Sequence, residues 1–367
     1  MAMKFNFVGK LVIPKDSAKF GFVSKSKTKA DKDSYRLNIG VKVDDNNMAF
    51  CELFDSVKDV IKTKNNDFED IEVKWADRLE KEIVEMVSFA RKNIVDLSKI
   101  VDGEERKEFI TGVDAVEYIL EHKNDIGDKK VMVTGTVDKQ PYKGKWYDKY
   151  KINNIYFLAD DDDTKAQLNI TADIYYNKDS VDMSDWESDH IAIIDGYVQQ
   201  YFSDEKKNYF VPQRFVFNAS KVDFTNEKQV KMTDFRLEDI KINKKNYHHL
   251  MWKCKLVKGA EEVEFDESQL TKKQKAQIEL GMATLDDFKP KNAIYGEKIS
   301  EIRLIKQLLT GDFADGLVDY AKPSEFEEEI YVMPTEESLD AVMKEAKETK
   351  EEPAKPVEAD EDEDLFG

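Results

Sequence analysis

The sequence contains no long apolar segment and few cysteines or histidines. It has no run of about 18 apolar residues, which excludes a membrane-spanning helix of ordinary length. Its two cysteines, Cys51 and Cys254, lie far apart and form no metal-ligand pair, so we expect both to be buried, reduced thiols of a cytoplasmic protein. His248 and His249, two of only four histidines, lack the spacing and companions of a zinc site. We therefore expect no metal ion and no other cofactor.

The sequence also lacks the usual motifs of an active site. It has no glycine-rich loop of the Walker type, so nothing supports nucleotide hydrolysis. Four aspartates at 160–163 could bind a divalent cation, but nuclease carboxylates come from separate strands and converge on two metal ions. A run of four is more typical of a solvated linker. No Ser–His–Asp or Cys–His set can be assembled from four histidines, and we predict a protein that is not an enzyme.

The formal net charge of −19 is unevenly distributed along the chain. Residues 325–367 contain seventeen acidic residues and four lysines, a net charge of −13, which leaves −6 for everything before them. Residues 1–43 carry ten basic and three acidic residues, and residues 129–151 carry seven lysines and two acidic residues. The chain therefore combines a body that has basic segments with a separate polyanionic tail.

Alternating and apolar-rich segments predict β-strands in the first 160 residues. Residues 35–43 alternate with a period of two, the mark of a half-buried strand, and residues 5–13 form an apolar-rich strand stopped by Pro14. Further strands are expected at 48–54, 130–137 and 150–158, and helical spacing predicts helices at 71–97 and 113–122. Five strands interrupted by helices between the third and fourth are typical of an OB barrel, although a sandwich would give similar strands.

A second β-rich unit follows the four aspartates. Residues 131–157 and 191–217 share a strand, an aromatic-lysine hairpin and a second strand at a spacing of about 61 residues, which suggests a duplicated barrel that 222–242 could close. The pattern beyond 247 is mixed and mainly helical. Helices are expected at 270–280 and 299–309, with Gly281 and Gly311 just beyond them.

We therefore predict a mainly β protein with helical insertions, of the α+β class, that contains two OB-like β-barrels. The predicted units are an OB-like barrel at 1–159 with a helical insertion at about 56–127, a second β-rich OB-like domain at 165–245, a mixed and mainly helical region at 246–333, and a disordered acidic tail at 334–367.

The segment 142–150 carries the most informative pattern for function. It places four aromatic residues and three lysines around a turn at Gly144. Flat rings stack on exposed bases and ammonium groups follow phosphates, so this combination is typical of a single-strand binding surface. The alternative is a hairpin whose rings pack on its own sheet while its lysines are solvated. The predicted nucleic-acid-binding residues here are Tyr142, Lys143, Lys145, Trp146, Tyr147, Lys149 and Tyr150.

Two other segments have similar chemistry. The hairpin at 201–210 has aromatic residues and lysines, although Asp204 and Glu205 offset its positive charge. The loop at 24–33 lies between the first two predicted strands, where OB barrels bind their ligands, and the alternative is an ordinary solvated loop. The candidate residues of the hairpin are Tyr201, Phe202, Lys206, Lys207 and Tyr209, and those of the loop and its flanks are Phe20, Phe22, Lys25, Lys27, Lys29, Tyr35 and Arg36.

The acidic tail closes with two large apolar residues, which follow five consecutive acidic residues at 360–364. Exposed apolar side chains gain nothing in water, so they could anchor in a pocket on a partner while the carboxylates steer the encounter. The tail could also occupy the protein's own basic groove as an electrostatic mimic of nucleic acid. The predicted partner-binding residues are Asp362, Asp364, Leu365 and Phe366.

Barrel domains followed by an acidic tail with an apolar tip resemble the single-stranded DNA-binding proteins of bacteria and their bacteriophages. Members of that group use the tip to recruit replication, recombination and repair proteins, and the resemblance implies the same role for Leu365 and Phe366. The tip differs from the bacterial pattern in having no proline before Phe366 and in ending with Gly367. The length, the helical insertion and the absence of Gly- and Gln-rich linkers indicate a bacteriophage protein, which would act in the cytoplasm of its host.

Three classes of function follow from these patterns. The first is a single-stranded DNA-binding protein that coats and protects single strands in replication, recombination and repair and recruits partners through its acidic tail. RNA stays open as a ligand, because stacking tolerates both nucleic acids. The second class is a virion, scaffolding or other protein-interaction role without nucleic-acid binding, which would explain the acidity without the hairpin. The third is a nucleic-acid enzyme or an RNA-binding regulator.

Overall fold

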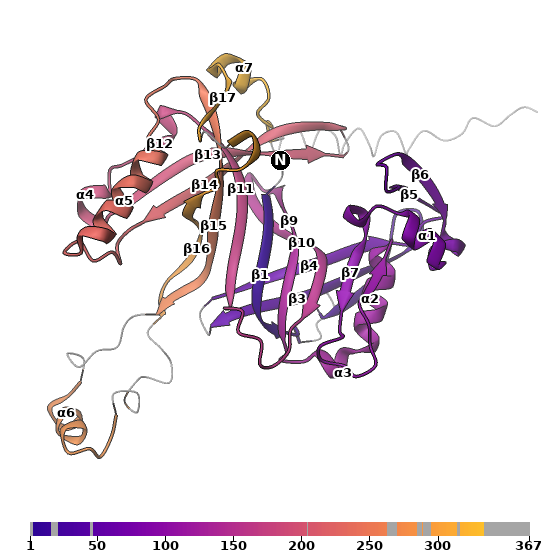
Figure 1. The fold of residues 1–367 in the computed structure, drawn as a ribbon, viewed down its shortest axis with the longest axis horizontal. Coiled ribbons are helices and arrows are strands. Elements are labelled where there is room, and N and C mark those ends of the chain that lie inside the picture. Colours follow the sequence, from indigo (N-terminus) through magenta and orange to yellow (C-terminus); the bar gives the residue numbers. More distant parts are fainter. Residues whose placement is uncertain are drawn as a thin grey trace, which may run out of the picture.

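Strands dominate the computed structural model, which describes residues 3–15, 21–44, 47–203, 205–262, 270–284, 288, 295–313 and 316–333. Within these ranges fifteen strands join in one hydrogen-bonded sheet, and two others form a separate ribbon (Figure 1). The predicted mainly β class is confirmed. None of the described helices is long and apolar enough to cross a membrane.

Five strands from the first half of the chain pair in a closed order, which we call the first ring. They are β1 (Met3–Val12), β3 (Asp33–Asp44), β4 (Asn47–Ser56), β9 (Lys130–Tyr142) and β10 (Lys145–Phe157). β1 pairs with β3 and β9, β3 pairs with β4, and β9 pairs with β10. A parallel pairing of β4 with β10 completes the order, so each strand has two neighbours within the ring.

The bending of these strands brings backbones close together at two glycines. A Cβ atom at Gly9 would lie 2.4 Å from the carbonyl oxygen of Lys42, where β1 crosses β3. A Cβ atom at Gly135 would lie 1.9 Å from the carbonyl oxygen of Lys151, where β9 runs beside β10. Only a residue without a side chain fits at either position.

Five strands from the second half pair in the same order and form the second ring. They are β11 (Gln167–Tyr176), β13 (Ile191–Phe202), β14 (Lys207–Asn218), β15 (Tyr247–Glu262) and β16 (Tyr295–Gln307). β11 pairs with β13 and β15, β13 pairs with β14, and β15 pairs with β16. β14 and β16 pair in parallel. In both rings the third strand in chain order therefore meets the fifth, and the segment between the third strand and the fourth contains at least one helix.

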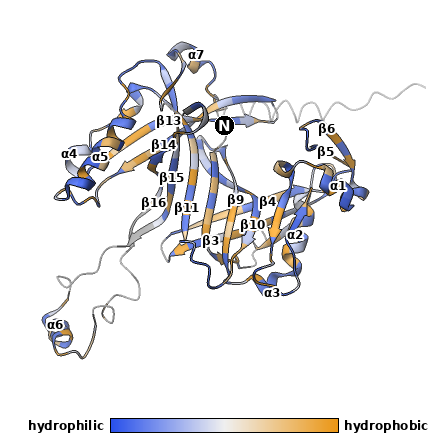
Figure 2. Ribbon diagram, in the orientation of Figure 1, coloured by the Kyte–Doolittle hydropathy of each residue, from blue (hydrophilic) through white to orange (hydrophobic). Residues whose placement is uncertain are grey.

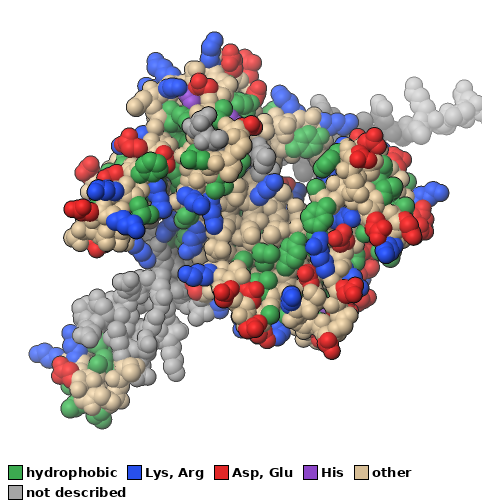
Figure 3. Space-filling model, viewed as in Figure 1, with side chains coloured by type: hydrophobic (Ala, Val, Ile, Leu, Met, Phe, Trp, Pro, Cys, Tyr) green, Lys and Arg blue, Asp and Glu red, His purple; other side chains and the backbone are tan. Residues whose placement is uncertain are grey.

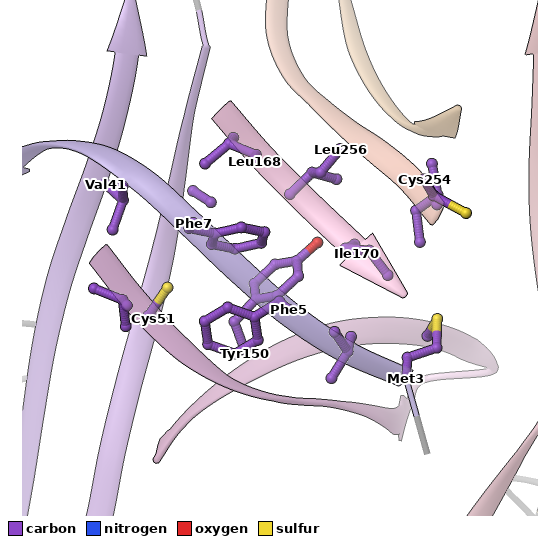
Figure 4. Close-up of a cluster of buried hydrophobic side chains, with 14 of the residues drawn as sticks. Met3, Phe5, Phe7, Val41, Cys51, Tyr150, Leu168, Ile170, Cys254 and Leu256 are labelled. Carbon is purple, nitrogen blue, oxygen red and sulfur yellow. The ribbon is translucent and has the colours of Figure 1, made fainter. Parts of the chain in front are cut away.

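The two rings meet through their first strands. β1 pairs with β11 from Lys4 opposite Thr171 to Val8 opposite Gln167, so β1 is hydrogen bonded on both sides. Apolar and polar residues alternate along the strands (Figure 2), and the apolar ones form a buried cluster that includes Phe5, Phe7 and Ile170 (Figure 4). Backbone pairing and the hydrophobic core both cross the predicted boundary between 159 and 165.

Smaller elements surround the two rings. The first half adds β2 (Val23–Lys27), β5 (Val60–Lys64), β6 (Asp70–Lys74), η1 (Trp75–Asp77), α1 (Lys81–Met86), η2 (Phe89–Arg91), β7 (Asn93–Asp96), β8 (Lys107–Phe109), α2 (Gly112–Glu121) and α3 (Lys123–Ile126). The second half adds η3 (Lys178–Ser180), β12 (Val181–Asp182), α4 (Trp186–Asp189), α5 (Glu227–Ile240), α6 (Lys272–Glu279), η6 (Gly311–Phe313), β17 (Val318–Ala321) and α7 (Pro323–Glu327).

Two of the predicted helices are confirmed. The segment predicted at 113–122 forms α2, whose N-terminus is capped by the Thr111 hydroxyl, which accepts a hydrogen bond from the Asp114 N–H at 3.2 Å. The segment predicted at 270–280 forms α6. Gly281 follows α6 with a φ of +67°, the conformation expected of a C-terminal cap.

Three other predictions about secondary structure are wrong. The segment 71–97 forms β6, the short helix α1 and β7. Val73 is buried on β6, which pairs with β5, and Leu79, which precedes α1, is exposed. Residues 299–307 of the predicted helix 299–309 belong to β16, where Ile302 and Leu304 lie two residues apart and both are buried against β15. The segment 222–242 contains α5, and β15 and β16 complete the second ring instead. The described part of 246–333 therefore contains more strand than helix.

Candidate nucleic-acid interface

The two aromatic-lysine hairpins predicted from the sequence lie side by side, joined through Lys139 of β9. The Lys139 N–H donates to Oε1 of Gln200 in β13 at 2.6 Å, and Nε2 of Gln200 donates to the Lys139 carbonyl oxygen at 2.9 Å. The buried ammonium group of Lys139 donates to Asp148 in its own hairpin at 2.7 Å and to Gln213 in the other at 2.6 Å. This polar network fixes the position of one hairpin relative to the other below their turns.

Side chains alternate between the two faces of the first hairpin. Its two-residue turn, Lys143–Gly144, has φ angles of +47° and +70°, as a type I′ turn requires, which confirms the predicted turn. Beyond the turn, Trp146 and Tyr150 share the inner face of β10, while Tyr147 shares the outer face with Lys145 and Lys149. The hairpin therefore presents one ring of β10 to solvent and turns two toward the protein.

Tyr331 lies between the tips of the two hairpins. Its ring stacks on Phe202 of β13 with centroids 4.3 Å apart and meets Trp146 of β10 edge-on at 5.6 Å. Tyr209 of β14 contacts the same ring at 5.5 Å. Trp146 and Phe202 are half-buried by this packing. Sequence reasoning missed Tyr331, because nothing in its acidic neighbourhood indicates a contact with either hairpin.

Three predicted rings are turned to solvent at this place. The exposed fractions are 61% for Tyr142, 51% for Tyr147 and 57% for Tyr201. Tyr142 and Tyr147 meet edge-on at 6.2 Å. The ammonium groups of Lys143 and Lys207 lie over the rings of Tyr142 and Tyr209 at 5.4 and 4.7 Å, and the side chains of Lys145 and Lys206 are exposed. A hydrogen bond donated to Glu205 raises the pKa of the Tyr209 phenol.

Two predicted stacking residues belong to the core instead. Tyr150 is 2% exposed and packs on Phe5 and Phe7 at centroid distances of 5.8 and 5.2 Å (Figure 4). Burial raises the pKa of its phenol well above the ordinary value. Phe22 is 1% exposed. Neither ring is available to a base, because each occupies an inward position of its segment, and these two predictions are wrong.

The predicted loop between the first two strands of the ring contains β2, which pairs with β3. Lys25 and Lys29 are exposed, and the ammonium group of Lys25 lies 4.7 Å from the centre of the Tyr35 ring. Lys27 forms an ion pair with Asp33 at 2.9 Å, and this hydrogen bond raises the pKa of its ammonium group. Phe20 lies outside the described residues.

The outer face of β3 and β4 carries two exposed rings that sequence reasoning missed. Phe50 and Phe54 are each 49% exposed, and the Arg36 guanidinium group lies over the Phe54 ring at 5.2 Å. Glu52 lies between them on β4 and forms ion pairs with Arg36 at 3.4 Å and with Lys149 of β10. The outer faces of β3, β4 and β10 are therefore continuous. Residues 49–54 alternate between the two faces of β4, so the sequence would have identified these rings if it had shown which of the two faces is buried.

The surface of the molecule is mixed in charge. On the face drawn in Figure 3, basic and acidic side chains are interspersed, and small hydrophobic patches lie between them. Two of the four aspartates at 160–163 pair with basic residues, Asp160 with Lys129 at 3.0 Å and Asp162 with Lys130 at 3.7 Å. In the described part of the chain, no group of three His, Cys, Asp or Glu side chains is placed to hold a metal ion.

Both cysteines are buried and unpaired, and burial raises the pKa of their thiols. The predicted partner-binding residues Asp362, Asp364, Leu365 and Phe366 lie outside the described residues. The described chain ends at 333, two residues after Tyr331, with Val332 exposed. Residue 333, the last that the structure describes, is therefore only two positions from the ring that contacts both hairpin tips.

No protein-family model and no curated protein matches the sequence. Among solved structures, the chain is similar to the wild-type single-stranded DNA binding protein from Thermus aquaticus, with a TM-score of 0.30, 7% identity and coverage of 84% of this chain and 92% of that one. A deletion mutant of the same protein gives a TM-score of 0.29, 9% identity and coverage of 84% and 93%. Similarity at this level does not transfer a function.

Proposed function

We propose that this chain is a single-stranded DNA-binding protein without enzymatic activity, which coats and protects single strands in replication, recombination and repair. The observation that carries the proposal is the cluster of solvent-exposed rings and lysines at the tips of two adjoining hairpins. Each base that stacks on a ring contributes about 1–3 kcal/mol, so Tyr142, Tyr147 and Tyr201 together could supply about 3–9 kcal/mol before the cost of ordering the strand. Lysines beside the rings would contact the phosphates.

The strand pairing supports an OB-like barrel in each ring. An OB barrel is a five-stranded Greek-key barrel that binds oligonucleotides on the face of its second and third strands and on the loops between strands 1 and 2 and between strands 4 and 5. In the first ring these places hold Lys25, Arg36, Phe54, Tyr142 and Tyr147. The candidate residues of the first ring thus fall where an OB barrel would hold its ligand.

The acidic tail completes the proposed function in two ways. Its net negative charge would compete with nucleic acid for the lysines of the hairpins at low salt. Its apolar tip, with Asp362, Asp364, Leu365 and Phe366, would dock on replication or recombination proteins. We place the protein in the cytoplasm of a bacteriophage-infected host.

A titration of the purified protein with oligo-dT, followed by tryptophan fluorescence at low and moderate salt, tests the proposal. We expect quenching by the single strand and none by duplex DNA of equal length, because stacking on the rings needs unpaired bases. The logarithm of the binding constant should fall with the logarithm of the salt concentration by about 0.7 per phosphate contact. If neither the full chain nor a chain without 351–367 binds, the proposal is overturned and a protein-interaction role replaces it.

A further inference from the structure

The segment that carries Tyr331 is anchored a few residues earlier by Phe326 of α7. The Phe326 side chain is fully buried and stacks on Tyr247 and Phe210 with centroids 3.8 and 4.3 Å apart. From this anchor the chain runs beside β14. The Phe210 N–H donates to the Glu329 carbonyl oxygen, and the Tyr331 N–H donates to the Phe210 carbonyl oxygen, both at 2.9 Å. The Tyr331 ring is therefore held in place by backbone bonds and by a buried aromatic ring.

Two separate sets of contacts join the hairpins. Below the turns, the Lys139 network links β9 to β13 and β14 through polar side chains. At the tips, the Tyr331 ring contacts both Trp146 of the first hairpin and Phe202 of the second. The exposed ring Tyr201 directly precedes Phe202 in β13, and the exposed ring Tyr142 flanks the turn of the hairpin that carries Trp146. The relative position of these two rings thus depends on the tips being held together.

We infer that Tyr331 is a positioning residue that holds the two hairpin tips together, so that their exposed rings form one composite site for a single strand long enough to cross both. This inference rests on the proposed single-strand binding function. Tyr331 acts through Trp146 and Phe202 and does not itself bind the strand. A short strand that occupies one hairpin binds without the Tyr331 contact. A longer strand binds more tightly with it, because a fixed second site raises the effective concentration for the second contact.

The test compares two lengths of oligo-dT, about 8 and about 20 nucleotides, in the range of one and two OB-like sites. For Tyr331→Ala in the full chain, we expect affinity for the short strand to stay within about twofold of wild type. Affinity for the long strand should fall about tenfold, as the tips separate and the effective concentration drops. Tyr331→Phe keeps the ring and should restore the wild-type ratio of the two affinities.

Phe202→Ala removes the same contact from the other side and should give the same change in the ratio, with no further change in the double variant. The inference is overturned if Tyr331→Ala leaves the ratio of long-strand to short-strand affinity unmoved, or if both affinities fall equally. Failure of the proposed function would look different, because the wild-type protein would then bind neither strand.

Discussion

Replacing Lys139 with methionine should remove the ammonium contact between the two hairpins and destabilise the protein. The substitution keeps the length of the side chain but removes the ammonium group, whose two acceptors lie in different hairpins. Only 7% of the Lys139 side chain is exposed, and its partners Asp148 and Gln213 are mostly shielded from water as well. Removing one partner of a buried ion pair costs about 3–5 kcal/mol. Because 20% of the Asp148 side chain still reaches solvent, we expect a loss near the lower bound, about 3 kcal/mol.

Urea unfolding followed by tryptophan fluorescence measures this loss. Lys145→Met is the matched control, since Lys145 is exposed two residues from Tyr147 and its replacement should change the free energy of unfolding by no more than about 0.5 kcal/mol. In a second step, Lys139→Met combined with Asp148→Leu removes the unpaired carboxylate and should recover part of the loss. A Lys139→Met protein as stable as the Lys145→Met control would refute the view that this network holds the hairpins together.

Further predictions concern the binding surface and its charge. Tyr147→Ala and Tyr201→Ala should each weaken single-strand binding by about 1–3 kcal/mol in calorimetric titrations and leave thermal unfolding unchanged, because both rings are about half exposed; unchanged affinity would exclude the ring as a stacking residue. Glu52→Gln should free Arg36 and Lys149 from their ion pairs, strengthen single-strand binding at low salt and steepen the salt dependence of binding by up to about 0.7 per freed cation. Glu72→Gln, which breaks an ion pair on the separate ribbon, is the control and should change neither quantity, and weaker binding by Glu52→Gln would contradict the prediction. Deleting 351–367 should strengthen binding at low salt, and an unaltered affinity would exclude competition by the tail.

Local patterns predicted most strands of the first ring, because period-two alternation reports burial on one face directly. They failed where apolar residues fit two periods at once. In the segment 299–309, Ile299, Ile302 and Leu304 suit a helix or a strand, and pairing with the distant strand β15 decides between them. Such pairing depends on residues far away in the sequence, so no local pattern contains it.

The internal similarity between 131–157 and 191–217 does not reflect equivalent positions of the two hairpins in the rings. Both segments are hairpins with rings and lysines near their turns. In the pairing order, however, β9–β10 supplies strands 4 and 5 of the first ring, whereas β13–β14 supplies strands 2 and 3 of the second. The hairpins are alike because hairpin chemistry is local, and they meet through the Lys139 contacts rather than by occupying equivalent positions.

The candidate site shows the same limit. The sequence identified Tyr142, Tyr147 and Tyr201, because rings beside lysines at a turn are recognisable from spacing alone. It could not assign Tyr150 to the core or Phe54 to the surface, since alternation defines two faces without saying which one is buried. The sequence could not indicate the role of Tyr331, because its contacts Trp146 and Phe202 belong to strands that lie far before it in the chain.

The most direct test of the proposed function is the affinity for single-stranded DNA of a protein in which all three exposed rings are removed, Tyr142→Ala, Tyr147→Ala and Tyr201→Ala together. Phe235→Ala, which removes an exposed ring from α5, serves as the control. We predict that the triple variant unfolds at the wild-type temperature and loses at least about 3 kcal/mol of binding free energy, roughly a hundredfold in affinity, while the control binds as wild type. A folded triple variant that binds single-stranded DNA as tightly as the wild-type protein would contradict the account.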